Sequence, residues 1–290
     1  MHVPSLEVHK AATLQEASAL LDRYAPDVRL LAGGTDVLVD LKSARYAVGH
    51  LVALGAISSL RGIAQGRNGL RIGALTTVTE LDRSPLVAGA YAALRDATSQ
   101  MATPQVRNAA TVGGNVAGAV PCADLPPVLI AMGATAFAWS AMGERTLPLE
   151  DLIVGPRRTI LRGDELLAAI DVPAPPPRFG AAYARFGLRA ANSIAVAGVA
   201  AAVALNNDGT VASARVVLCA VAPVPKLSKA AARALLGRVL DDAACVQAAA
   251  AATAEAEPIS DLRGSAEYRR RLVSTLTRRA LLAARQRAGR

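Results

Sequence analysis

The sequence has few cysteines, few aromatic residues and no long apolar run free of charges. Its three cysteines, Cys122, Cys219 and Cys245, lie far apart and form no C-x-x-C motif. By themselves they therefore assemble neither a disulfide framework nor a metal or iron–sulfur site. No run of about 20 uncharged apolar residues is present, which predicts no membrane span. The first residues, MHVPSLEVHK, lack the features of a secretory signal, so we expect a cytoplasmic protein.

Positive charge exceeds negative charge, and the 290 residues carry a formal net charge of +9. A basic excess is typical of proteins that bind nucleic acid or an acidic protein surface. Aromatic residues make up only 3% of the chain, whereas proteins that bind single strands need aromatic side chains for base stacking. We therefore predict no nucleic-acid partner, and expect a solvated helix face or a surface that docks protein subunits. Many of the arginines lie near the C-terminus: Arg263, Arg269, Arg270, Arg271, Arg278, Arg279, Arg285, Arg287 and Arg290.

Hydrophobic residues make up 52% of the sequence, enough for a sizeable core. Thr13, with Glu16 three residues later, is typical of a helix start, and apolar residues at helical spacing follow. Further helices are expected at 86–97 and within 123–134. Short apolar runs predict strands at 28–32, 50–54, 69–74, 135–139 and 166–172.

A proline-rich segment at 173–180, PAPPPRFG, divides the chain. Successive prolines do not fit inside a helix or a central strand. We predict a first domain at 1–175, made of two sub-domains that meet near residue 60, and a second domain at 178–290. In the second, an Asn-Asp-Gly turn at 206–209 predicts a β-hairpin, and helices are expected from Ser228 onward. The predicted fold class is α+β, with a small antiparallel sheet covered by helices in the second domain.

The segment Ala32 to Asp36, AGGTD, places two glycines directly after a predicted strand. Glycine readily adopts positive φ, and two in succession let neighbouring amides converge on one point, the nest that binds anions. Thr35 adds a hydroxyl donor. Asp36 would repel a phosphate from within, so we expect it to cap the next helix or to bind a ribose or backbone group at the rim. Taken alone, the same segment also fits a plain turn.

A second segment, TPQVRNAATVGGNVAGAVPCADLPP at 103–127, repeats this device. A short β-like stretch, ATV, precedes Gly113 and Gly114, and the amide of Asn115 both donates and accepts hydrogen bonds. Asp124 precedes LPP, where the free amides of a helix start would hold its carboxylate, which would also accept a hydrogen bond from a hydroxyl. Two nests about 80 residues apart suit a ligand with a diphosphate and an extended polar ring system better than a single phosphate.

Other familiar motifs are missing. Neither G-x-G-x-x-G after a strand nor G-x-x-x-x-G-K-[ST] is present, so the mechanisms of the Rossmann fold and the P-loop are not indicated. His2, His9 and His50 have no acidic or thiol partner at ligand spacing, and no metal site is predicted. No G-x-S-x-G elbow indicates a hydrolase. Cys122 adjoins the second glycine pair, which would lower its pKa, although a lone cysteine is commonly a small buried hydrophobe.

Four segments in this order resemble the FAD-binding medium subunits of molybdenum-containing hydroxylases, the group of xanthine dehydrogenase, carbon monoxide dehydrogenase and 4-hydroxybenzoyl-CoA reductase. They are LLAGGTDVLVDLK, QVRNAATVGGNVAGAVPCADLPP, LRGDELLAAIDVP and YARFGLRAANSIAVAGVAAAV, and the resemblance covers nearly the whole chain. It implies a vanillyl-alcohol-oxidase-like (PCMH-type) FAD-binding domain, a C-terminal α+β domain of the same subunit family, and FAD as the cofactor.

The resemblance also implies the cofactor contacts. Residues 30–37 are expected around the diphosphate, residues 111–115 at the flavin and phosphates, and Asp124 on a polar group of FAD. Met101 stands where some relatives have an aromatic beside the cofactor, and Leu167 where the family packs on the isoalloxazine. Where several members have lysine, this chain has Arg185 as the candidate substitute. The expected cofactor-binding residues are Leu30, Leu31, Ala32, Gly33, Gly34, Thr35, Asp36, Val37, Met101, Thr111, Val112, Gly113, Gly114, Asn115, Asp124, Leu167 and Arg185, with no catalytic side chain and no metal ligand.

A heteromeric complex is implied as well. The resemblance implies that FAD takes electrons from [2Fe–2S] clusters in a small subunit, fed by a large molybdenum-cofactor subunit, and passes them to an external acceptor. The expected assembly is a heterohexamer, a dimer of heterotrimers. Some members of the family insert a cysteine-bearing loop for a [4Fe–4S] cluster after the second glycine pair. This chain has one cysteine and no insertion there, so the resemblance implies no such cluster in it. The alternatives are a stand-alone flavin-dependent oxidase or reductase of the same fold and a cofactor-free scaffold subunit.

Overall fold

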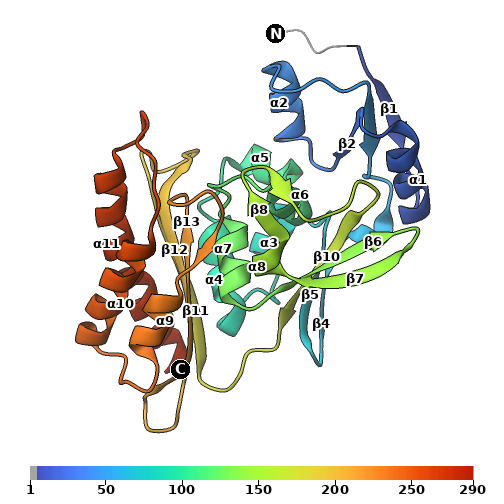
Figure 1. Ribbon diagram of the computed structural model, residues 1–290. Coiled ribbons are helices and arrows are strands. Elements are labelled where there is room, and N and C mark those ends of the chain that lie inside the picture. The colour runs from blue at the N-terminus through green and yellow to red at the C-terminus, as the bar shows by residue number, and fades with distance from the viewer. Residues whose placement is uncertain (1–4, 290) are drawn as a thin grey trace.

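The computed structural model describes residues 5–289, so His2 and Arg290 lie outside the described residues. Within that range, helices combine with strands in four sheets (Figure 1). No helix of this part of the chain is both long and apolar enough to cross a membrane.

A small parallel sheet opens the chain, in the order β1-β3-β2, together with two helices. Helix α1 begins where the sequence predicts, because the Thr13 hydroxyl accepts a hydrogen bond from the Glu16 amide at 3.1 Å. Strand β2 leads directly into the first glycine pair, which therefore lies at the carboxyl end of this sheet. The elements are β1 (Glu7–Lys10), α1 (Leu14–Tyr24), β2 (Val28–Leu31), α2 (Val37–Lys42), β3 (His50–Ala53) and the 3-10 turn η1 (Ser58–Leu60).

A five-stranded antiparallel sheet follows, in the order β4-β5-β10-β6-β7. Its strands confirm the runs predicted at 69–74, 135–139 and 166–172. The helix expected from residue 86 begins only at Ala92, because a 3-10 turn containing Gly89 at φ 53° precedes it. The elements are β4 (Ile63–Gly66), β5 (Gly69–Gly73), α3 (Val78–Arg83), η2 (Gly89–Tyr91), α4 (Ala92–Thr98), α5 (Pro104–Ala109), α6 (Val112–Ala117), α7 (Leu125–Ala131), β6 (Thr135–Ser140), β7 (Gly143–Pro148), α8 (Leu149–Leu152), β8 (Ile153–Gly155), β9 (Arg158–Thr159) and β10 (Leu166–Pro173).

The chain after the proline-rich segment forms a four-stranded antiparallel sheet, β11-β12-β13-β14, and three helices. The predicted hairpin is confirmed, since β12 pairs with β13 and Gly209 adopts φ 85° in the turn. Ser228 caps the first of the expected helices through its hydroxyl. The elements are β11 (Phe179–Gly187), β12 (Ala195–Leu205), β13 (Val211–Cys219), β14 (Lys226–Leu227), α9 (Lys229–Leu235), α10 (Asp242–Glu255) and α11 (Ala266–Ala288).

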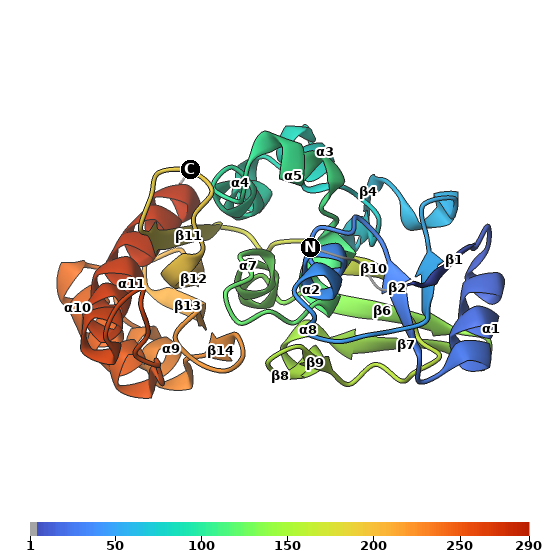
Figure 2. The same ribbon diagram turned by 90° about the horizontal axis from the view of Figure 1, so that it is seen from above.

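Strand β12 is buried on both faces and joins two cores. Ala200 and Ala202 belong to a core shared with α4, α7 and β10, whereas Val199 and Val203 point to the other side and pack with α10 and α11. This alternation is what the two-residue period of a strand produces. Figure 2 shows α4 and α7 between the five-stranded sheet and β11–β13, with α10 and α11 on the far face. The last sheet therefore packs directly on α4 and α7, the helices on either side of the second glycine pair in the chain.

Candidate functional site

The loop between β2 and α2 carries successive backbone amides that have no hydrogen-bond acceptor in the described part of the chain. Within residues 5–289, no atom accepts a hydrogen bond from the amides of Gly33, Gly34, Thr35, Asp36 or Val37. Gly34 adopts φ 73°, the left-handed conformation that turns neighbouring amides toward one point. The Asp36 side chain makes no hydrogen bond to the helix start, so capping of α2, the first of its two expected roles, is wrong. The other role, a bond to a ribose or backbone group at the rim, stays a prediction. The loop has the donors and the backbone geometry of an anion-binding nest.

The second glycine pair is not a nest, and that prediction is wrong. Thr111 caps helix α6, its hydroxyl accepting from the Gly114 amide at 3.1 Å, so the ATV stretch is a helix start and no strand. The Gly113 amide donates to the Ala74 carbonyl at 2.8 Å. A Cβ atom on Gly113 would lie 2.6 Å from the Cβ of Ala74. Gly113 is therefore needed for a close backbone contact, and contact of these residues with a cofactor stays a prediction.

The two glycine segments nevertheless meet in space, as the sequence analysis expects. A Cβ atom on Gly33 would lie 1.9 Å from the carbonyl oxygen of Ala109 and 3.1 Å from the Cα of Ala110. Ala110 directly precedes Thr111, the cap of α6. Figure 1 shows α2, which follows the first loop, above α5 and α6. The loop with the free amides therefore lies beside the residues that directly precede α6.

An ion-pair cluster that the sequence analysis missed holds α2 in this position. Asp40, a buried residue of α2, accepts from Arg45 at 2.7 Å and from the guanidinium of Arg157. The Arg157 amide in turn donates to the Ala119 carbonyl at 2.8 Å, just beyond α6. Burial raises the pKa of Asp36 nearby, and Arg157 opposes that shift. No local pattern points from Asp40 to an arginine more than 100 residues away, so the sequence gives no signal for this clamp.

Asp124 is buried at the junction with the C-terminal sheet. Its Oδ1 accepts from the Tyr183 hydroxyl at 2.7 Å, and its Oδ2 lies 3.4 Å from Nη1 of Arg185. Burial raises the pKa of Asp124, and Arg185 and the Tyr183 hydrogen bond oppose that shift. It makes no side-chain hydrogen bond to the start of α7, so the predicted capping is wrong. Both oxygens face β11, and a contact with FAD stays a prediction.

Arg185 is also buried, with 5% of its side chain exposed. Its Nη1 donates to the Gln100 carbonyl at 2.7 Å, and its Nη2 donates to the Ser193 carbonyl. Both terminal nitrogens are thus bound to protein oxygens, so Arg185 links β11 to the loop after α4 and to the loop that follows β11. Its expected role as a basic cofactor contact stays a prediction.

Cys122 contradicts the expectation of a lowered pKa. Burial raises the pKa of its thiol, Asp124 and more weakly Asp36 add to the shift, and Arg263 opposes it. Two acidic side chains and a half-buried position outweigh any effect of the neighbouring helix start. The expectation that Cys122 carries an activated thiol is therefore wrong.

Most of the remaining expected cofactor-binding residues pack in a hydrophobic core, and Asn115 has one unused hydrogen-bond donor. Met101 and Leu167 are both buried in the core around α7 and β10. The Ala74 amide donates to the Ala168 carbonyl, which ties the strand of Leu167 to the second segment. Asn115 accepts from the Leu125 amide at 3.4 Å through Oδ1, and within residues 5–289 its Nδ2 has no acceptor. The side chains of four residues pack against hydrophobic cores, and their contact with a cofactor stays a prediction: Leu30, Leu31, Ala32 and Val37.

The cap of α6 gives a test of the second segment. Replacing Thr111 by valine leaves the Gly114 amide without its acceptor, so we expect the free energy of unfolding to fall by about 1 kcal/mol. Serine at position 111 keeps the hydroxyl and is expected to cost only a few tenths of that amount. Urea denaturation of the three proteins measures the difference. Equal stability of the valine and serine variants would show that the cap contributes nothing.

Comparison with known proteins agrees with this geometry. A family described as "FAD binding domain in molybdopterin dehydrogenase" matches residues 4–175, and "CO dehydrogenase flavoprotein C-terminal domain" matches residues 181–284. The carbon monoxide dehydrogenase medium chain of Hydrogenophaga pseudoflava is 35% identical over 281 residues, 97% of each chain. The xanthine dehydrogenase FAD-binding subunit of Escherichia coli O157:H7 is 33% identical over 275 residues, 94% of each chain.

A solved structure shows the same fold. It is carbon monoxide dehydrogenase from Hydrogenophaga pseudoflava in a form that lacks the Mo-pyranopterin moiety of the molybdenum cofactor, with a TM-score of 0.95 and 36% identity over 99% of both chains. The predicted α+β class with an FAD-binding domain is confirmed. The chain belongs to the family of FAD-binding medium subunits of molybdenum-containing hydroxylases, oxidoreductases that include carbon monoxide dehydrogenase and xanthine dehydrogenase, and its cofactor is FAD.

Proposed function

We propose that this chain is the electron-transfer subunit of a heteromeric molybdenum hydroxylase. It receives electrons from the [2Fe–2S] clusters of a small subunit, which a large molybdenum-cofactor subunit supplies, and passes them through FAD to an external acceptor. The observation that carries the proposal is the run of free amides at 33–37, held against Ala109 beside the second segment. The domain division at 1–175 and 178–290 is part of this proposal.

The donors present fit the diphosphate of FAD. Amides of residues 33–37 stabilise negative charge without adding a positive side chain, as nests do. The Thr111 hydroxyl uses its oxygen to cap α6 and keeps its hydrogen for a ligand, and the Nδ2 of Asn115 supplies another donor. FAD, when bound, supplies a group that exchanges electrons with both one-electron and two-electron partners. The chain binds and orients it.

Two carboxylates near the glycine segments are already paired with other side chains, which favours electron transfer over substrate chemistry. Asp40 is bound by Arg45 and Arg157, and Asp124 by Tyr183 and Arg185. These contacts occupy oxygens of both carboxylates, so neither acid is free to reach a substrate proton. A stand-alone oxidase would need a base free to take a proton from its substrate. The paired acids therefore support the subunit over that alternative.

The proposed partner subunits carry the iron–sulfur clusters and the molybdenum cofactor. Cys219 and Cys245 are buried, and within residues 5–289 no cysteine belongs to a cluster of three or more side chains that could hold a metal, so we assign the iron–sulfur centres of the proposed pathway to another subunit. The names "medium chain" and "FAD-binding subunit" of the relatives support a multi-subunit assembly, for which we propose the heterohexamer of two heterotrimers. Three free thiols fit a reducing compartment, and we propose the cytoplasm.

Purification tests the proposal. We expect the isolated chain to be yellow, to release one FAD per chain on denaturation, and to co-purify from its source with two further chains that carry iron and molybdenum. Absorption spectra, FAD fluorescence after denaturation and metal analysis measure these properties. A colourless protein that binds no added FAD would support the scaffold alternative. A yellow protein that oxidises or reduces a substrate without other subunits would support the stand-alone enzyme.

A further inference from the structure

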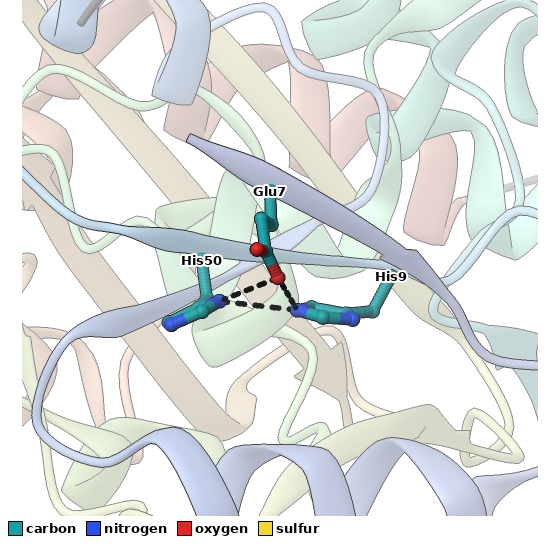
Figure 3. A group of neighbouring side chains, drawn as sticks. All are labelled: Glu7, His9 and His50. Atoms are coloured by element: carbon teal, nitrogen blue, oxygen red, sulfur yellow. Dashed lines mark hydrogen bonds and ion pairs between the residues drawn. The ribbon is translucent and has the colours of Figure 1, made fainter. Parts of the chain in front are cut away.

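Two histidines and a glutamate converge on one face of the first sheet, away from the glycine segments. Figure 3 shows Glu7, His9 and His50 with their polar atoms facing one another. Nε2 of His9 lies 3.1 Å from Nδ1 of His50. One carboxylate oxygen of Glu7 lies 3.7 Å from the first nitrogen and 3.8 Å from the second. The expectation that no acidic partner faces the histidines is therefore wrong for His9 and His50.

Strand register brings the three side chains together. Glu7 and His50 are direct partners in the parallel pair β1–β3, and His9 lies two residues after Glu7 on the same face of β1. The ring of Tyr24, at the end of α1, stacks on both imidazoles, with centroid distances of 4.6 Å to His9 and 3.9 Å to His50. The two rings are held between a strand pair and an aromatic side chain, so their nitrogens are oriented before any ligand arrives.

We propose that Glu7, His9 and His50 form a binding site for a divalent transition-metal ion of the zinc type. The oxygen–nitrogen distances exceed the range of hydrogen bonds, yet Glu7 lies nearly equally far from both nitrogens. Metal–ligand bonds of about 2.0–2.2 Å place neighbouring ligand atoms roughly 3.1–3.8 Å apart at angles of about 100–130°. All three measured separations fall in that range.

The ligand set selects the class of ion. Imidazole nitrogens suit Zn²⁺, Ni²⁺ and Cu²⁺, whereas Mg²⁺ and Ca²⁺ prefer sets made of oxygen alone. The His9 and His50 side chains are 19% and 22% exposed, and that of Glu7 is 72% exposed, so water can complete the coordination. Strand β1 lies at the edge of its sheet, paired only with β3 among the described strands. A metal held from both strands would fasten this edge strand to the sheet.

Calorimetric titration of the FAD-loaded chain with ZnCl₂ tests the site. We expect one zinc ion per chain, and about 100-fold weaker binding when a ligand is removed in His9→Gln or Glu7→Gln. Glu144→Gln, which removes an exposed strand carboxylate elsewhere, is the matched control and is expected to bind zinc as the parent does. MgCl₂ is expected to give no heat of binding at this site.

A second measurement separates binding from folding defects. Zinc at about 100 times its dissociation constant is expected to raise the melting temperature of the parent chain by roughly 5 °C, and to leave that of Glu7→Gln unchanged. Because the Glu7 side chain is mostly exposed, this variant is expected to fold and to keep its FAD. Absence of zinc binding by the parent, or equal zinc affinity of the parent, His9→Gln and Glu7→Gln, would overturn the proposal.

Discussion

Replacing Gly33 by alanine is expected to weaken FAD binding by about 100-fold. The added Cβ would lie 1.9 Å from the Ala109 carbonyl oxygen, a distance that no pair of nonbonded atoms tolerates, so the loop must move away from α5. Hydrogen bonds to a charged group contribute about 1.5–3 kcal/mol each, so misplacing one or two amides gives a loss of this size. Titration of the chain freed of FAD, followed by quenching of flavin fluorescence, measures the affinity.

Gly55→Ala is the matched control for this substitution. Gly55 is exposed, follows β3, and has no heavy atom within 4 Å of the position that a Cβ would take. We expect it to bind FAD as the parent does. Circular dichroism of the FAD-free proteins shows whether Gly33→Ala still folds. A folded Gly33→Ala protein with the affinity of the parent would show that the amides of residues 33–37 do not hold the cofactor.

Local patterns predicted those features that depend on near neighbours in the chain. The Thr13 cap, the strand before the first glycine pair and the hairpin at 206–209 each follow from a few adjacent residues. The two glycine segments were predicted to lie close together because both were expected to bind the same ligand. The close approach of Gly33 to Ala109, in the second segment, confirms that they do.

A glycine can be required for positive φ or for a close backbone contact, and the sequence does not tell these two requirements apart. Gly34 has positive φ, as a nest requires, whereas Gly113 lies in a helix and is needed because Ala74 approaches its Cα. Both appear as Gly-Gly after an apolar stretch. Only the neighbour in space, which belongs to a different strand or loop, distinguishes them.

Side-chain contacts between residues far apart in the chain could not be predicted from the sequence either. Asp40 meets Arg157, and Glu7 meets His50, through sheet register and loop packing that no local spacing encodes. Asp124 shows the same limit, because it precedes a helix and its position suggests a cap, whereas its oxygens face Tyr183 and Arg185.

Replacing Asp124 by alanine is expected to lower the free energy of unfolding by about 3–5 kcal/mol, because it leaves the buried guanidinium of Arg185 without its counter-charge. The Tyr183 hydroxyl, also buried, loses its acceptor. Asp171→Ala is the control, since the pair Asp171–Arg71 spans 3.0 Å but is 36% and 50% exposed. Exposed pairs contribute about 0–1 kcal/mol, so this variant is expected to unfold nearly as the parent does. Urea denaturation of the FAD-free proteins measures both.

The double substitution Asp124→Ala with Arg185→Met distinguishes a charge effect from lost packing. Removing both partners leaves no unpaired charge, so the double variant is expected to be more stable than the sum of the single losses predicts. FAD affinity, measured on the same proteins, separates the two roles open to Asp124. A residue that only joins α7 to β11 changes the stability of the FAD-free chain and leaves the affinity nearly constant, whereas a cofactor contact lowers both. Additive losses in the double variant, or an Asp124→Ala protein as stable as Asp171→Ala, would contradict the buried ion pair as the link between the FAD-binding part and the C-terminal sheet.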